Sequence, residues 1–353
     1  MSAAPYTLPG RVVRFGETVS LRIRARTVVV SLILVVIVLA LSVFAIGTGE
    51  FEIPPGTVVS TLLGGGDPGS AFIVRELRLP RVLCALLVGA ALGVSGAVFQ
   101  SLTRNPLGSP DIVGFPQGAT VGALVVITIM AGSGAAVTVG ALTGGVVTAF
   151  AVYLLAFKRG GTSGFRIVLI GIAISYLMIS ITDYLLARAR IEEAQEATRW
   201  LLGSVNGRTW DDVTPLIMSL IVLAPLAIPA GRALRALELG DDAAHALGMR
   251  VERSRLALVA LAVGLVSVTT VAVGPIGFIA LTAPQIARRI TRTAGLPLVC
   301  SALLGAVLLL VSDLAAQRLV PDRALPVGVM TGLFGGLYLA WLLSMEWRKG
   351  RRG

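Results

Sequence analysis

Long apolar stretches alternate with short polar segments along most of this chain. A helix needs roughly 20 predominantly apolar residues to cross the hydrocarbon core of a bilayer, and ten stretches approach that length. They are residues 28–47, 81–102, 113–132, 135–157, 165–186, 213–230, 255–273, 276–293, 297–317 and 325–345. The pattern predicts an all-α, polytopic membrane protein with about ten transmembrane helices in a single transmembrane domain, residues 28–345.

Glycine and proline residues predict where helices pack closely and where the backbone between them is irregular. Glycines at four-residue spacing let helix backbones approach closely within a membrane bundle. Such sets are Gly89/Gly93, Gly140/Gly144 and Gly328/Gly332/Gly336. Prolines predict irregular backbone between helices at Pro106 to Pro110, at Pro275 and from Pro321 to Pro326.

The most charged interruption of the apolar pattern covers residues 231–255. Asp241 or Asp242 is expected to cap a short helix, and Ala243 to Leu247 to form its apolar face. Gly248 is expected to end the helix, because glycine adopts the left-handed conformation at least cost. A helix this short is marginal alone. We therefore expect the flanking helices to hold it against a partner, with a solvated loop as the alternative.

Composition and charge support a membrane protein. The 353 residues are 55% apolar and 14% charged, with a mean hydropathy of +0.87, which is outside the range of soluble domains. Most of the 30 Lys and Arg lie on the same side of the predicted spans as the N-terminus, and such residues are retained in the cytoplasm. The N-terminal tail 1–27, the 231–255 segment and the basic tail 346–353 are therefore predicted to be cytoplasmic. The net charge of +11 then reflects topology and not nucleic-acid binding.

A cleavable signal peptide is the alternative for the first 47 residues. Its apolar region would cover about 7–15 residues, whereas the run from Val28 to Ile46 is longer, so a retained first span is expected. Cys84 and Cys300 both fall within predicted spans and imply no disulfide framework. Asp183 and Asp313 are the ionisable residues within spans, and they are expected to contact headgroup water or a neighbouring helix.

The sequence lacks the motifs typical of nucleotide binding and of metal-dependent catalysis. The two lysines, Lys158 and Lys349, do not lie in a Gly-x4-Gly-Lys-Ser/Thr phosphate-binding loop. The sequence also has no His-Glu-x-x-His motif and no Cys/His cluster. The chain is therefore not expected to bind ATP itself, and active transport would need an energy source on another protein.

Four stretches carry a resemblance to a known family. They are Arg78-Leu-Pro-Arg-Val, Arg104-Asn-Pro-Leu-Gly-Ser-Pro-Asp-Ile-Val-Gly, Leu239-Gly-Asp-Asp-Ala-Ala-His-Ala-Leu-Gly and Gly274-Pro-Ile-Gly-Phe-Ile-Ala-Leu with Ala283-Pro-Gln-Ile-Ala-Arg-Arg. Together they resemble the permeases of bacterial ABC importers for iron-siderophores and vitamin B12, and within that family the ferric enterobactin permeases. The family often has His at the position of Gln285, and this difference argues against essential imidazole chemistry.

The resemblance implies a type II ABC importer permease fold in the bacterial cytoplasmic membrane, with both termini cytoplasmic. The implied partners are a second related permease subunit, in a heterodimer more than in a homodimer, two ATPase subunits and an extracytoplasmic siderophore-binding protein. The implied cargo is a ferric siderophore of the catecholate, enterobactin-like type. The chain itself would be no enzyme and would hold no cofactor or metal, because ATP and Mg²⁺ would bind the partner ATPase. A vitamin B12 or haem permease, an ion-coupled secondary transporter and a membrane enzyme are the alternatives.

The resemblance also implies roles for particular residues. A coupling helix that docks on the ATPase would comprise Glu238, Leu239, Gly240, Asp241, Asp242, Ala244, Leu247 and Gly248. Arg78, Arg81 and Arg318 would meet carboxylates of the binding protein on the outer face, with anchoring at the membrane interface as the alternative. Thr162, Ser163, Gly164 and Phe165 would form a cytoplasmic gate.

Overall fold

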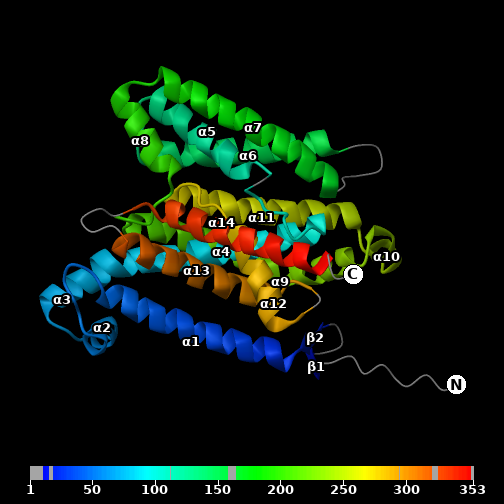
Figure 1. Cartoon of the computed structure of the whole chain (residues 1–353), viewed down its shortest axis with the longest axis horizontal. Helices are drawn as coiled ribbons and strands as arrows, with labels where there is room; N and C mark the ends of the chain where they lie inside the picture. The colour runs from blue at the N-terminus through cyan, green and yellow to red at the C-terminus, as the bar shows by residue number, and fades with distance from the viewer. Residues whose placement is uncertain are drawn as a thin grey trace.

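The long helices lie roughly side by side along the long axis of the molecule (Figure 1). The computed structural model describes residues 11–15, 19–111, 113–157, 164–293, 295–319 and 325–350. The short helix α10 and the β1–β2 hairpin lie at one end, called here the α10 end (Figure 1). The helices α2, α3 and α8 lie at the opposite end, called the α8 end.

Fourteen α-helices, one π-helical stretch and two short strands make up the described part of the chain. The strands are β1 (Arg11–Phe15) and β2 (Val19–Ile23), paired antiparallel. The first helices are α1 (Ala25–Gly47), α2 (Pro55–Leu62), α3 (Pro68–Phe72), the π-helical η1 (Ile73–Arg78), α4 (Leu79–Thr103), α5 (Phe115–Thr128) and α6 (Ala135–Ala156). The others are α7 (Gly164–Arg188), α8 (Ile191–Leu201), α9 (Trp210–Glu238), α10 (Asp241–Ala246), α11 (Val251–Val273), α12 (Ile279–Thr291), α13 (Leu298–Arg318) and α14 (Val327–Gly350).

Local chemistry explains several helix starts. The Asp67 carboxylate accepts a hydrogen bond of 3.0 Å from the Ser70 N–H and so caps α3. Thr209 and Asp212 form a capping box at the start of α9, where Asp212 accepts from the Thr209 N–H at 3.0 Å. Proline occupies the first turn of α2, α3 and α5, where its missing N–H leaves no helical bond unmade.

Each of the ten predicted apolar segments contains a helix. Within the described residues, seven helical runs are long and apolar enough to cross a membrane: α1, the continuous run Pro68–Thr103, α6, α7, α9, α11 and α13. The apolar part of α14, Val327–Leu342, and α5 are shorter, and α12 has 13 residues. Among the described residues, two glycine- and proline-rich segments stay non-helical and precede α5 and α12: residues 104–111 with 113–114, and residues 274–278. These two helices are therefore shorter than the sequence pattern predicts.

The all-α class is confirmed for the membrane-spanning part of the chain. The hairpin of β1 and β2 lies in the predicted N-terminal tail, outside this bundle. Helix α1 begins at Ala25 and α14 reaches Gly350, so both extend past the predicted domain limits 28–345. Helix α9 likewise continues to Glu238, well into the 231–255 segment.

Helix α4 lies at the centre of the bundle, packed against α9, α11, α12 and α13. Its glycines make this possible. A Cβ atom added at Gly93 would lie 2.1 Å from the Ser301 carbonyl oxygen of α13, and one at Gly96 would lie 1.7 Å from the Ala280 oxygen of α12. The predicted close packing at Gly93 is thus confirmed, because only a residue without a side chain allows these backbones to touch.

The other two glycine sets have different surroundings. A Cβ at Gly144 would lie 2.2 Å from the Gly118 oxygen of α5, so this set also packs closely. By contrast, no described atom lies within 4 Å of a Cβ added at Gly332 or Gly336. Within the described part of this chain, Gly332 and Gly336 therefore do not bring two helices together. Gly328 does make a close approach, because a Cβ added there would lie 2.1 Å from the Leu202 oxygen.

Candidate functional site

Helix α10 is a short helix whose two ends are both formed by glycine. Gly240 is the N-cap residue, with φ 113° and no side-chain cap hydrogen bond. The predicted capping by Asp241 or Asp242 is therefore wrong, because both carboxylates lie one or two residues beyond the cap. At the other end Gly248 has φ 79°, and its N–H donates to the His245 oxygen at 2.9 Å. The Met249 N–H donates to the Ala244 oxygen at 3.1 Å, which completes a Schellman motif and confirms the predicted end.

Two large apolar side chains flank α10 and face away from the bundle. Leu239 is 69% exposed and Leu247 is 68% exposed, whereas Ala244 between them is fully buried. Ala244 packs in the same apolar cluster as Leu237 and Val251 from the adjoining helices. Helix α10 thus contacts the bundle through Ala244, and Leu239 and Leu247 remain exposed.

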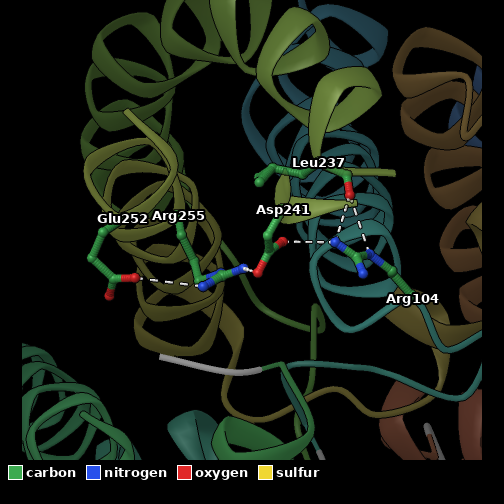
Figure 2. A network of polar contacts seen from close by, with 5 residues as sticks. All are labelled: Arg104, Leu237, Asp241, Glu252 and Arg255. Carbon is green, nitrogen blue, oxygen red and sulfur yellow. Dashed lines mark hydrogen bonds and ion pairs between the residues drawn. The ribbon is translucent and has the colours of Figure 1, made fainter. Parts of the chain in front are cut away.

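Asp241 is held by two arginines from different parts of the chain (Figure 2). Arg104, which follows α4, donates from Nη2 to one Asp241 carboxylate oxygen at 2.7 Å. Arg255 of α11 donates from Nη2 to the other oxygen at 2.9 Å. Each carboxylate oxygen therefore has its own charged donor, an arrangement stronger than a neutral hydrogen bond.

The charges around Asp241 favour its ionised form. Burial alone acts to raise the pKa of this carboxyl group, but the hydrogen bond and charge of Arg255, and the charge and hydrogen bond of Arg104, outweigh that effect. The pKa of Asp241 is therefore below its usual value. The contact stays ionic over the neutral pH range.

Arg104 also holds the end of α9 (Figure 2). Its Nε and Nη2 atoms donate to the Leu237 carbonyl oxygen at 3.1 and 2.8 Å. Nearby, the Ser101 hydroxyl donates to a Glu238 carboxylate oxygen at 2.8 Å. Helix α4 is thus tied to both sides of the α9–α10 connection.

Arg255 has further partners on its own helix and beyond. Its side chain is almost buried and lies 3.5 Å from a Glu252 carboxylate oxygen (Figure 2). Glu252 in turn accepts a hydrogen bond of 3.1 Å from the Tyr153 hydroxyl of α6. The sequence did not predict that Arg104 and Arg255 belong to this site. Arg104 begins one of the stretches that carry the family resemblance, and Arg255 ends the charged segment 231–255.

The three arginines predicted to dock a binding protein all lie at the α8 end. Arg78 donates to the carbonyl oxygens of Ile46 at 2.7 Å and Phe51 at 2.6 Å. Arg318 donates to the Thr48 hydroxyl at 3.3 Å, and its guanidinium carbon lies 4.9 Å from the centre of the Phe44 ring. The structure thus brings these two arginines together around the end of α1.

Arg81 has a different environment. Its Nε and Nη2 atoms donate to the two Asp313 carboxylate oxygens at 3.0 and 2.7 Å, and its Nη1 donates to the Asn206 side chain at 2.9 Å. Asp313 is only 2% exposed. It therefore contacts a neighbouring helix, which is one of the two environments predicted for it, and not headgroup water. Asp183 is exposed on α7. Arg81 therefore joins α4, α13 and the loop before α9.

The predicted gate lies only partly within the described residues. Thr162 and Ser163 fall outside them. Gly164 begins α7 against the end of α4, where an added Cβ would lie 2.8 Å from the Leu102 oxygen. Phe165 is exposed at the same end. Both described residues therefore lie near α10, at the α10 end of the bundle.

A bundle of membrane-spanning length, with a short helix flanked by exposed leucines at one end and clustered arginines at the other, is the architecture of a membrane transport subunit. The chain belongs to the FecCD transport family, whose model matches residues 32–345. It is thus a transport subunit and not an enzyme, and a multi-pass protein of the bacterial cytoplasmic membrane.

Named relatives and a solved structure agree with this assignment. The chain is 46% identical to the ferric enterobactin transport system permease protein FepG of Escherichia coli K12, over 87% of this chain and 93% of that protein. It is 37% identical to the Fe(3+)-citrate import system permease protein YfmE of Bacillus subtilis 168, over 87% and 92% of the two chains. A metal-chelate type ABC transporter in an inward-facing conformation superposes with a TM-score of 0.81 at 26% identity, over 90% of this chain and 99% of that chain.

Proposed function

We propose that this chain is the permease subunit through which an ABC importer moves a ferric siderophore of the catecholate class into the cytoplasm. The observation that supports this cargo most is the 46% identity to the ferric enterobactin permease along almost the whole chain. The iron is cargo that stays chelated, so the chain needs no iron ligand of its own.

The proposed assembly has four further subunits. A second related permease completes the translocation path, in a heterodimer, and two ATPases bind at the α10 end, where ATP and Mg²⁺ are held by the ATPases. A siderophore-binding protein docks from outside at the α8 end. The names of relatives as permease proteins of transport systems support this arrangement in outline.

Helix α10 is the proposed coupling helix. Its exposed leucines, Leu239 and Leu247, are suited to an apolar groove on the ATPase, because burying each would remove apolar surface from water. Movement of the ATPase would then reach α4 and α11 through the two arginines that hold Asp241. The residues Thr162 to Phe165 are the proposed cytoplasmic gate beside this contact.

The three arginines at the α8 end are the proposed docking residues for the binding protein. Arg78 and Arg318 now bond to neutral oxygens, so a carboxylate of the binding protein offers each a stronger partner. Arg81 already has a buried carboxylate partner in Asp313. A docking carboxylate would therefore share Arg81 with Asp313.

Reconstitution tests the proposed function. The purified chain, assembled with the second permease, the ATPases and the binding protein in liposomes, should take up ferric enterobactin when ATP is inside the vesicles. The Leu247→Asp variant should insert normally but lose ATPase association and uptake, because a carboxylate cannot be buried in an apolar groove without a partner. Leu247→Met, which keeps the apolar surface, is the matched control and should retain both.

Two outcomes contradict the proposal. Uptake by the chain alone, driven by a proton gradient without any ATPase, would identify an ion-coupled secondary transporter. Unchanged ATPase binding by Leu247→Asp would remove α10 as the docking helix.

A further inference from the structure

The segment between α4 and α5, residues 104–114, starts at the coupling site and returns into the bundle. Arg104 at its start holds Asp241 and the Leu237 carbonyl oxygen. Gly114 at its end packs against α7, where an added Cβ would lie 2.7 Å from the Ser175 hydroxyl oxygen. Residues 104–107 are exposed and residues 108–110 are buried, so the described part of the segment passes from the surface beside α10 into the bundle.

A pair of buried glutamines joins this segment to α12. Gln285 of α12 donates from Nε2 to the Gln100 side-chain oxygen at 2.6 Å and to the Pro106 carbonyl oxygen at 3.1 Å. Gln100 of α4 donates from its own Nε2 to the Leu281 carbonyl oxygen at 2.9 Å. The two side chains are only 3% (Gln100) and 7% (Gln285) exposed. Both N–H groups of the Gln285 amide are thus used, and one side chain connects α4, segment 104–114 and α12.

The start of α12 lies close to the same segment. Asp111 is within electrostatic reach of the backbone N–H of Phe278, the N-cap residue of α12, and of the Ser109 hydroxyl, and one of its carboxylate oxygens is buried without a hydrogen-bond partner among the described residues. Phe278 has φ 68°, a conformation that a bulky residue rarely adopts. The Phe278 ring lies against α14, since a Cβ added at Gly335 would be 2.3 Å from it. Helix α12 is therefore hydrogen-bonded at two points, at Gln285 to Pro106 and Gln100, and at Leu281 to Gln100 at the end of α4, from which the segment continues.

Two attachment points hold a helix more firmly than one, because a single bond leaves it free to rotate about that bond. We propose that segment 104–114 and α12 move as one body with the α10 clamp, and that Gln285 is the positioning residue that fixes α12 to it. This inference rests on the proposed function, in which α10 receives the movement of the ATPase. Helix α12 would then shift with the coupling helix during each transport cycle.

The proposal predicts a loss of coupling when the amide is removed. In the full complex in liposomes, Gln285→Leu should lower ferric siderophore uptake per ATP hydrolysed by about tenfold, which is within the range found for residues that couple distant sites. ATPase association should not change, because α10 is untouched. Gln285→His keeps one of the two N–H donors, so its uptake per ATP hydrolysed should lie between those of the wild type and Gln285→Leu. Gln195→Leu, the same substitution at an exposed position of α8, is the matched control and should leave the ratio unchanged.

The ratio of siderophore uptake to ATP hydrolysis distinguishes a positioning role of Gln285 from an effect on folding alone. A variant that only folds less well loses uptake and ATP hydrolysis by the same factor, so an unchanged ratio in Gln285→Leu would overturn the proposal. A Gln285→His variant as uncoupled as Gln285→Leu would overturn it too. Failure of the wild-type complex to import the siderophore in the same assay would instead contradict the proposed function.

A cross-link provides a test that does not depend on how well the leucine variant folds. Pro106→Cys and Gln285→Cys are combined in a chain whose Cys84 and Cys300 are replaced by alanine. Because Gln285→Cys removes the amide, the reduced double variant should be uncoupled like Gln285→Leu. If the segment and α12 move as one body, joining the two new cysteines should restore uptake per ATP hydrolysed. A cross-linked complex that hydrolyses ATP but no longer imports would show that these parts must separate, and would overturn the proposal.

Discussion

At the scale of single residues, Asp241 and Asp313 each connect separate helices through ion pairs with arginine, at opposite ends of the bundle. Each carboxylate accepts two hydrogen bonds from arginine: Asp313 from the single guanidinium of Arg81, and Asp241 from Arg104 and Arg255. A charge-assisted bond can hold helices that are far apart in the sequence. Asp241 therefore decides where α10 stands relative to α4 and α11.

Replacement of Asp241 should loosen α10 without unfolding the bundle. Asp241→Asn removes the negative charge from between Arg104 and Arg255, and we expect ATPase binding to weaken about fivefold, equivalent to ~1 kcal/mol, because the carboxylate is partly exposed. A pull-down of the ATPase with the variant complex measures this. Asp183→Asn, the same substitution at an exposed carboxylate of α7, is the matched control, and an equal effect there would contradict the role given to Asp241.

The pH dependence of the same contact has a definite sign. The folded pKa of Asp241 lies below its usual value, so the stabilisation is fully present above the unfolded pKa, about 3.9. It is lost only as pH falls through the lowered folded pKa. Hydrogen exchange of α10, corrected for the intrinsic rate, should therefore show equal protection between about pH 5 and 8. Protection that weakens within this window would contradict an ionic clamp.

At the scale of helices, contact between α4 and α13 depends on the absence of side chains. Gly89, Gly93 and Gly305 bring the two backbones together. Helix α4 also carries Arg81 near its start and Arg104 just after its end. Any displacement of α13 from α4 would thus disturb the Arg81–Asp313 pair.

A methyl group at the centre of this contact should be costly. Gly93→Ala places a Cβ 2.1 Å from the Ser301 backbone oxygen, so α13 must move, and we expect the free energy of unfolding to fall by about 1–3 kcal/mol. Thermal unfolding of the purified chain in detergent measures the change. Gly332→Ala meets no described atom within 4 Å and should leave the stability within about 0.5 kcal/mol. Equal stability losses in the two variants would contradict the packing argument.

At the scale of the whole molecule, the two ends of the bundle differ in the groups that they offer. The α10 end presents exposed leucines beside a charged clamp, and the α8 end presents Arg78 and Arg318. The basic tails of the sequence lie on the same side as α10 in the predicted topology. We therefore propose that the α10 end faces the cytoplasm.

Reporter fusions test this orientation. Alkaline phosphatase fused after Gly353 should be inactive, and a fluorescent protein at the same position should fold, because both report a cytoplasmic location. Phosphatase inserted after Gly64, in the loop between α2 and α3 at the α8 end, should be active. Active phosphatase at the C-terminus would reverse the orientation and place α10 outside the cell.

Much of the architecture was predictable because it depends on local properties. Runs of apolar residues predict the ten helical segments, and Gly248 predicts the end of α10, since left-handed backbone suits glycine wherever it occurs. The start of α10 was predicted wrongly, because Gly240 holds the cap position and Asp241 lies one residue beyond it, where its carboxylate bonds to two arginines.

The sequence by itself determined the membrane class, the positions of the helices and the charged segment that contains the proposed coupling site, because hydrophobicity and capping act over neighbouring residues. Only the tertiary structure decided that Arg104 and Arg255 share Asp241, that Gln285 joins α12 to the segment after α4, and that Arg81 is paired with Asp313. These contacts join residues from separate helices or loops, most of them more than a hundred positions apart, and their pairing is selected by how the helices pack. A pattern of apolar and polar residues cannot specify which buried charge meets which, since several arginines in this chain could serve each carboxylate equally well until the bundle has formed.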